Sequence, residues 1–157
     1  MRQRFTAWIG LAAVLAAAIT SLARAADTSY LGQWKLDSAV IAPWADPKNP
    51  DPAEKNALIG KTITLAAGGI AGPKPFPCKK PVYKVSDFTA DMLFEGAFGE
   101  MHDKDKKADP EKLAASLGFA GTSWKTLETG CEIDWHFVDP TTAKIGLDDF
   151  VYTSKKQ

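Results

Sequence analysis

The chain has 157 residues, 45% of them hydrophobic, and its 19 basic and 19 acidic side chains leave no formal net charge. This length predicts one compact domain. Its basic residues are scattered or lie in short mixed runs such as 102–112, which argues against a nucleic-acid-binding or membrane-surface-binding protein.

Residues 1–25 have the pattern of a secretory signal peptide. A basic start precedes the apolar run 7–19, and Ala-Arg-Ala at 23–25 is a small-x-small cleavage site. The apolar run is short for a membrane span, so an uncleaved anchor is the less favoured alternative. Cleavage after residue 25 leaves one domain at 26–157 and predicts a periplasmic or secreted protein without a membrane anchor in its mature form.

The first predicted strand covers YLGQWKLDSA at 30–39. Its side chains alternate with a period of two, which is typical of a strand with one buried face. The face expected to point inward contains Gly32, Trp34, Leu36, Ser38 and Val40.

Two proline-rich segments, APWADPKNPDP at 42–52 and GPKPFPCKKP at 72–81, are predicted to be irregular loops. Between them, LIGKTITLAA at 58–67 predicts a strand with Ile63 and Leu65 inward. The Gly-Gly pair at 68–69 then predicts a hairpin turn.

One helix is predicted, at DPEKLAASLGF in 109–119. Asp109 is a favourable cap, Pro110 suits the first turn, and Gly118 ends the helix. The preceding apolar segment ADMLFEGAF at 90–98 has no clear period.

The remaining segments predict further strands separated by turn residues. These strands are PVYKVSDF, TSWKTLE, CEIDWHFV, AKIGL and FVYTS. Short sequential strands favour closure, because closure removes exposed sheet edges. We therefore predict an all-β fold, a single antiparallel barrel of about eight strands with one short helix.

The Gly-x-Trp sequence at 32–34 resembles the N-terminal element of lipocalins and their calycin relatives. In those proteins the tryptophan packs across the base of the barrel. The resemblance implies that Gly32 and Trp34 pack the base here.

Most of the mature part resembles a family of small exported bacterial proteins with a calycin-type barrel. The matching segments are GQW, APWADP, LIGKTITL, GPKPFPCKKPVY, LFEGAF, LGFAGTSWKTLETGC and HFVDPTTA. This resemblance implies the fold and export, but no ligand or activity.

Cys78 and Cys131 are the only two cysteines. In an oxidising compartment such a pair most simply forms a disulfide. A redox-active or metal-binding pair is the alternative, although the spacing lacks a Cys-x-x-Cys pattern.

The two histidines suggest no catalytic site by themselves. His136 alternates with Trp135 and Phe137, so we expect an outward strand residue or, as the alternative, part of a ligand rim. His102 lies in an acidic segment that could surround a cation, although a solvated loop is favoured. The acidic residues of that segment are Glu100, Asp103 and Asp105.

The sequence has no nucleophile-elbow or phosphate-loop motif, so we expect no enzyme activity and no cofactor. The favoured hypothesis is a lipocalin-like periplasmic protein that binds a small apolar or amphipathic ligand. Its pocket would be lined by aromatic side chains drawn from Trp44, Phe94, Trp124, Trp135 and Tyr152.

The alternative is a filled barrel that inhibits a secreted hydrolase, such as a lysozyme or a protease. The loops at 42–52 and 72–81 would then bind the enzyme, with Trp44 or Phe76 as an anchor. An open interior favours the ligand carrier, and a packed interior favours the inhibitor or a structural role.

Overall fold

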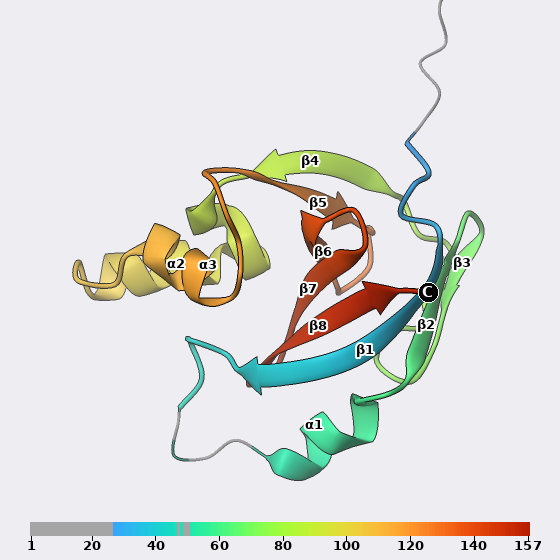
Figure 1. The fold of residues 1–157 in the computed structure, drawn as a ribbon, viewed down its shortest axis with the longest axis horizontal. Coiled ribbons are helices and arrows are strands. Elements are labelled where there is room, and N and C mark those ends of the chain that lie inside the picture. Colours follow the sequence, from blue (N-terminus) through green and yellow to red (C-terminus); the bar gives the residue numbers. More distant parts are fainter. Residues whose placement is uncertain (1–26, 47, 49–50) are drawn as a thin grey trace, which may run out of the picture.

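Eight antiparallel strands form one sheet in the computed structural model, which describes residues 27–46, 48 and 51–157 (Figure 1). The predicted signal peptide lies outside the described residues. The strands are β1 (Gly32–Ile41), β2 (Thr62–Ala66), β3 (Gly69–Ala71), β4 (Lys84–Phe88), β5 (Trp124–Glu128), β6 (Trp135–Asp139), β7 (Thr142–Leu147) and β8 (Phe150–Lys156). The prediction of a mainly β fold with about eight antiparallel strands is confirmed.

The sheet curls into a half-barrel and remains open. Its strand order is β3-β2-β1-β8-β7-β6-β5-β4, and within the described residues no ladder joins the two edges β3 and β4. The structure therefore has an open sheet where the sequence predicts a closed barrel. The proline-rich segment 72–81 follows β3, and the prolines in this segment have no N–H to donate to a ladder. Only Cys78 in this segment pairs with β3, through backbone hydrogen bonds of 2.7 and 3.0 Å to Ile70.

A bulge in β1 reverses the predicted alternation of its side chains. Leu36 pairs with Ser154 of β8, but Ser38 pairs with Thr153, so one residue of β1 is unmatched. Side chains beyond a bulge change faces. Leu36 is accordingly buried, whereas Val40 is 52% exposed. The expectation that Ser38 and Val40 share the buried face of Trp34 is wrong.

The predicted helix is present as α3 (Pro110–Ser116). The carboxylate of Asp109 caps it by accepting hydrogen bonds from the N–H groups of Glu111, at 3.0 Å, and Lys112, at 3.3 Å. Gly118 follows the helix with φ of +93°, a conformation that favours glycine. The start and end signals in the sequence therefore predict this helix correctly.

The described chain contains two further helices that the sequence analysis misses. α1 (Pro52–Leu58) begins with the same Asp-Pro signal as α3, with Asp51 accepting from the N–H of Ala53 at 2.8 Å. α2 (Leu93–Lys104) follows a short 3-10 helix, η1 (Ala90–Met92). None of the helices in the described residues is long and apolar enough to cross a membrane.

Both faces of the sheet bury side chains. The inner face of the curl holds large residues that are at most 1% exposed, namely Trp34, Leu36, Ile63, Leu65, Leu127, Trp135, Ile145 and Tyr152. The opposite face packs against the helices in a second core that includes Leu93, Phe94, Phe98, Ala114, Trp124 and Val151. Figure 1 shows α2 and α3 together on one side of the sheet, away from β2 and β3. We call this second surface the helix-covered face.

Candidate functional site

Trp34 is fully buried in the inner core. Its indole Nε1 donates a hydrogen bond of 2.8 Å to the backbone oxygen of Tyr30. The ring packs edge-on against Trp135, with centroids 5.4 Å apart, and also contacts Phe137. Gly32 adopts φ of +128°, which disfavours a side chain. The Gly-x-Trp element is therefore part of a filled inner core.

The structure does not bring the five predicted ligand-binding residues together. Trp135 and Tyr152 belong to the inner core, while Phe94 and Trp124 belong to the core of the helix-covered face, against which Trp44 packs. Trp124 of β5 and Trp135 of β6 point to opposite faces, because side chains alternate along paired strands, and Phe94 lies in α2, which packs on the face of Trp124. A single interior pocket cannot be lined by all five.

Trp44 and Phe94 do meet, on the helix-covered face. Their ring centroids are 5.2 Å apart, and the indole Nε1 of Trp44 donates to the backbone oxygen of Asp148 at 3.0 Å. Gly146 of β7 lies directly beneath both rings. A Cβ atom at this position would lie 2.9 Å from Cδ1 of Phe94 and 3.3 Å from the indole, so the absence of a side chain lets the rings pack onto the strand.

The turn at the start of α2 has an unusual backbone. Phe94, Glu95 and Gly96 all adopt left-handed conformations, with φ of 53°, 58° and 84°. For residues other than glycine this conformation costs on the order of 1–3 kcal/mol each, and surrounding contacts must hold it. Here the backbone N–H of Phe94 donates to Nε2 of His136 at 3.1 Å.

His136 is a buried structural residue, only 1% exposed. Because Nε2 accepts from Phe94, the neutral ring donates from Nδ1 to Oγ1 of Thr126, 2.8 Å away. Burial lowers the pKa of His136 to about 3, so the ring is neutral near pH 7. The expectation of an outward residue is wrong, since α2 covers this face of β6.

A pocket of about 390 Å³ opens beside this turn. One part of its wall is aromatic and apolar, with Trp44, Phe94 and Ala97. Another part holds four carboxylates, from Glu95, Glu132, Asp134 and Asp148. No lysine or arginine is among the described lining residues. We call this site the acidic pocket.

Backbone strain is concentrated at the acidic pocket. Within the described chain, the non-glycine residues with positive φ are Phe94, Glu95 and Asp148, and all three line it. Unfavourable conformations of this kind cluster at active sites and ligand clamps. The coincidence of strain and cavity therefore marks this pocket as the candidate site.

The four carboxylates of the acidic pocket differ from the paired carboxylates elsewhere in the described residues. Within the described part of the chain, none of the four pocket carboxylates forms an ion pair. The pKa of Asp134 is raised, first by burial and then by the charges of Glu128 and Glu95, although the N–H of Thr129 donates to this carboxylate at 3.3 Å.

The predicted disulfide lies next to the acidic pocket. Cys78 and Cys131 are at disulfide distance, with Cα atoms 6.6 Å apart. Cys131 directly precedes the pocket residue Glu132, and Cys78 follows the pocket residue Pro75 by three positions. The bond therefore joins two segments that line the pocket.

Phe76 does not serve as an exposed anchor. It is only 4% exposed and belongs to the inner core. This placement contradicts its suggested role at the tip of a binding loop.

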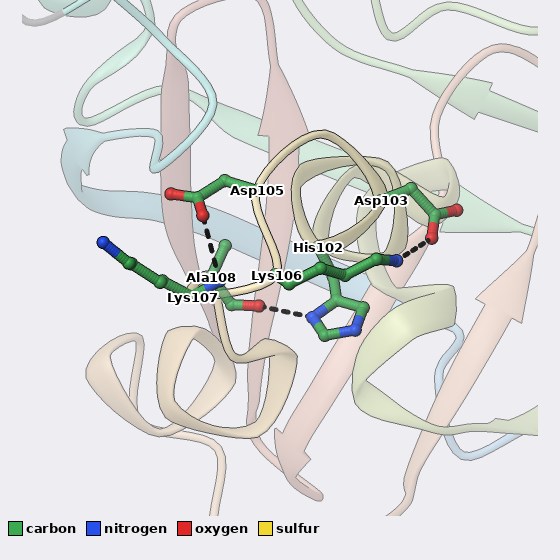
Figure 2. A network of polar contacts seen from close by, with 6 residues as sticks. All are labelled: His102, Asp103, Asp105, Lys106, Lys107 and Ala108. Atoms are coloured by element: carbon green, nitrogen blue, oxygen red, sulfur yellow. Dashed lines mark hydrogen bonds and ion pairs between the residues drawn. The ribbon is translucent and has the colours of Figure 1, made fainter.

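Figure 2 shows the segment from His102 to Ala108, which runs from the end of α2 towards α3 and is held by hydrogen bonds and an ion pair within the segment. The His102 ring donates from Nδ1 to the backbone oxygen of Ala108 at 2.8 Å, and Asp103 pairs with Lys106 at 2.9 Å. Asp105 accepts from the N–H of Lys107, on the side of the loop away from Asp103. The described residues include no group of three or more His, Cys, Asp or Glu side chains that could hold a metal ion.

No protein-family model, curated protein or solved structure matches the chain. Evidence for the function of the protein therefore comes from the geometry of the acidic pocket.

Sequence reasoning missed most of this site. Of the acidic pocket residues it selected Trp44 and Phe94 as ligand-binding residues, and it gave His136 as part of a ligand rim only as an alternative. The carboxylate of Glu95 lies in α2 and those of Glu132 and Asp134 in the connection from β5 to β6, far apart in the chain, and no local spacing links them. The one available signal was the Glu-Gly pair at 95–96 inside an apolar run, because glycine there is compatible with a turn.

Proposed function

We propose that the protein is a non-enzymatic binding protein of an oxidising, exported compartment, and that it holds a small amphipathic molecule in the acidic pocket. The observation that supports this function is the meeting of three strained residues, an aromatic wall and unpaired carboxylates around one cavity. Small-molecule sites typically combine an apolar wall with a few fixed polar groups.

The proposed pocket lies on the helix-covered face of the sheet, whereas a carrier with an open barrel would bind its ligand on the inner face. Trp34, Trp135 and Tyr152 fill the inner face, so the helix-covered face is the better candidate for the ligand. A calycin-like relationship for the sheet stays part of this proposal, on the Gly-x-Trp sequence at 32–34.

His136 has a structural role in the acidic pocket and is not available as a general base. Both ring nitrogens have hydrogen-bond partners, and burial keeps the ring neutral. A general base needs a free nitrogen within reach of the substrate proton. His136 has none, although it lines the acidic pocket.

The inhibitor hypothesis has less support. Trp44 packs against Phe94 and Phe98, and Phe76 is buried in the inner core. Neither ring is available as a freely protruding anchor for a secreted hydrolase.

Native mass spectrometry of the mature protein, isolated gently from its own periplasm, tests the proposal. We expect a bound mass of a few hundred daltons that disappears on denaturation. Ala97→Trp fills the acidic pocket and should remove the bound mass. Ala115→Trp is the matched control, because Ala115 is an exposed helical alanine that does not line the pocket.

Three results would contradict the proposed function. These are a wild-type protein with no bound mass, a bound mass that survives Ala97→Trp, or co-isolation with a hydrolase in place of a small molecule. The last result would restore the inhibitor hypothesis.

A further inference from the structure

We infer that the acidic pocket selects an organic cation, in which an ammonium or guanidinium group is attached to an apolar body. This inference rests on the proposed function and adds the chemical class of the ligand. It follows from the arrangement of carboxylates and rings around one cavity.

The carboxylates approach the cavity from separate elements. Glu95 lies in the left-handed turn of α2, whereas Glu132 and Asp134 lie in the connection between β5 and β6. With no basic side chain among the described lining residues, the cavity has a negative potential. Such a cleft attracts cations and repels anions.

The aromatic wall suits the same ligand. A cation within about 6 Å of an aromatic ring face is attracted by the ring quadrupole, most strongly for tryptophan. The indole N–H of Trp44 is already bonded to the backbone of Asp148, so it is not free to donate to an anion. Trp44 is partly exposed and can present ring surface to the ligand, while Phe94, which is only 6% exposed, packs behind it.

The environment of Asp134 only weakly stabilises the ionised carboxylate, so a bound positive charge could add to its stabilisation. This carboxylate is partly buried, and its accepted hydrogen bond from Thr129 is long, at 3.3 Å. Burial, with the charges of Glu128 and Glu95, raises its pKa. A positive nitrogen nearby would stabilise the ionised form.

A metal ion fits these residues less well. A calcium ion needs six to eight oxygen ligands converging at 2.3–2.6 Å. The described residues contain no His, Cys, Asp or Glu group with that kind of convergence. An organic cation needs only one or two of the carboxylates together with the rings.

Three ligands with the same body provide the test, namely 2-phenylethylammonium, 2-phenylethanol and phenylacetate. Calorimetric titration of the mature protein should give the tightest binding for the ammonium, with the alcohol at least about tenfold weaker and phenylacetate unbound. Glu95→Gln and Asp134→Asn should each weaken ammonium binding by about tenfold and leave alcohol binding unchanged.

Glu100→Gln and Ala97→Trp are the controls that separate the effect of charge from the effect of shape. Glu100→Gln removes an exposed carboxylate of α2 that pairs with Lys104 outside the pocket, and it should leave ammonium binding unchanged. Asp134→Asn keeps an oxygen that can accept from the N–H of Thr129, so a loss of ammonium affinity in this variant reports the missing charge. Ala97→Trp should abolish binding of both the ammonium and the alcohol.

The outcomes distinguish this inference from the proposed function. Equal binding of all three ligands, abolished by Ala97→Trp, would retain a binding pocket and overturn cation selection. Displacement of the ammonium by calcium chloride at matched ionic strength would assign the carboxylates to a metal and also overturn it. Failure of all three ligands to bind overturns the inference, while the native mass measurement separately decides the proposed function.

Discussion

The backbone N–H of Phe94 donates a hydrogen bond to Nε2 of His136. A side chain of β6 thereby fixes the left-handed turn of α2, 42 residues earlier in the chain, and the same ring is held by Thr126 of β5. The sheet thus determines the position of Glu95, the residue that follows Phe94 in the acidic pocket.

Replacing His136 should therefore destabilise the fold strongly. His136→Phe leaves the buried N–H of Phe94 and the hydroxyl of Thr126 without this partner, for a loss of about 3 kcal/mol in the free energy of unfolding. Urea unfolding measures the change. His102→Phe is the control, because its single bond to Ala108 is only partly buried. Equal losses in the two variants would contradict the proposed importance of His136.

Stability should also depend on pH through His136. Its pKa is about 3 in the folded protein and near 6.5 in the unfolded chain, so the unfolded state binds the extra proton between these values. The contribution is complete above pH 6.5 and falls with decreasing pH, by up to about 1.4 kcal/mol per unit. Unfolding at pH 7, 6 and 5 should show this loss in the wild type and a flatter profile in His136→Gln. Parallel profiles would disprove the assignment.

A methyl group at position 146 should disturb the aromatic wall. Gly146→Ala places Cβ against Phe94 and Trp44, and we expect a loss of about 1–3 kcal/mol in stability together with a changed tryptophan emission spectrum. Gly68→Ala is the control, because a Cβ at position 68 meets no atom within 4 Å. An unperturbed Gly146→Ala protein would mean that the rings move aside freely.

Removing the disulfide should reduce stability and affect the acidic pocket. The bond joins residues separated by 53 positions, for which loop-closure entropy predicts about 4 kcal/mol. The Cys78→Ser, Cys131→Ser double variant should unfold at lower urea concentration and bind the ammonium probe more weakly while still folded. Unchanged affinity in the folded variant would show that the bond stabilises the chain without shaping the pocket.

The two carboxylates Glu95 and Asp134 should be electrostatically coupled. Burial is the main cause of the raised pKa of Asp134, and the charges of Glu128 and Glu95 add to it. Glu95→Gln should consequently lower this pKa, as followed by the carboxyl carbon signal in an NMR titration. Glu100→Gln should leave the pKa unchanged. An unaltered titration in Glu95→Gln would place the two groups too far apart to share one ligand.

Much of the sheet could be predicted from local patterns. Alternation placed Ile63 and Leu65 inward, and the cap and stop residues Asp109 and Gly118 defined α3 correctly. The change of face after Leu36 could not be predicted, because a bulge depends on pairing with β8. The helix α1 could have been predicted, since Asp51 and Pro52 repeat the start signal of α3.

The site was harder to predict, because it depends on which face of the sheet the helices cover. His136 has the sequence pattern of an outward residue, and only the packing of α2 buries it. Trp44, Glu95 and Asp134 are likewise brought together only by the tertiary fold. Local periodicity identifies the faces of a strand, but it does not identify what covers each face.

The open edge at β3 affects the tendency of the protein to self-associate at high concentration. An exposed edge strand can pair with an edge of another molecule and begin aggregation. β3 has only three residues, and the chain that follows contains four prolines within 72–81. Short edges and missing N–H donors both oppose such pairing. The β3 edge is therefore a poor template for self-association, although the sheet is open there.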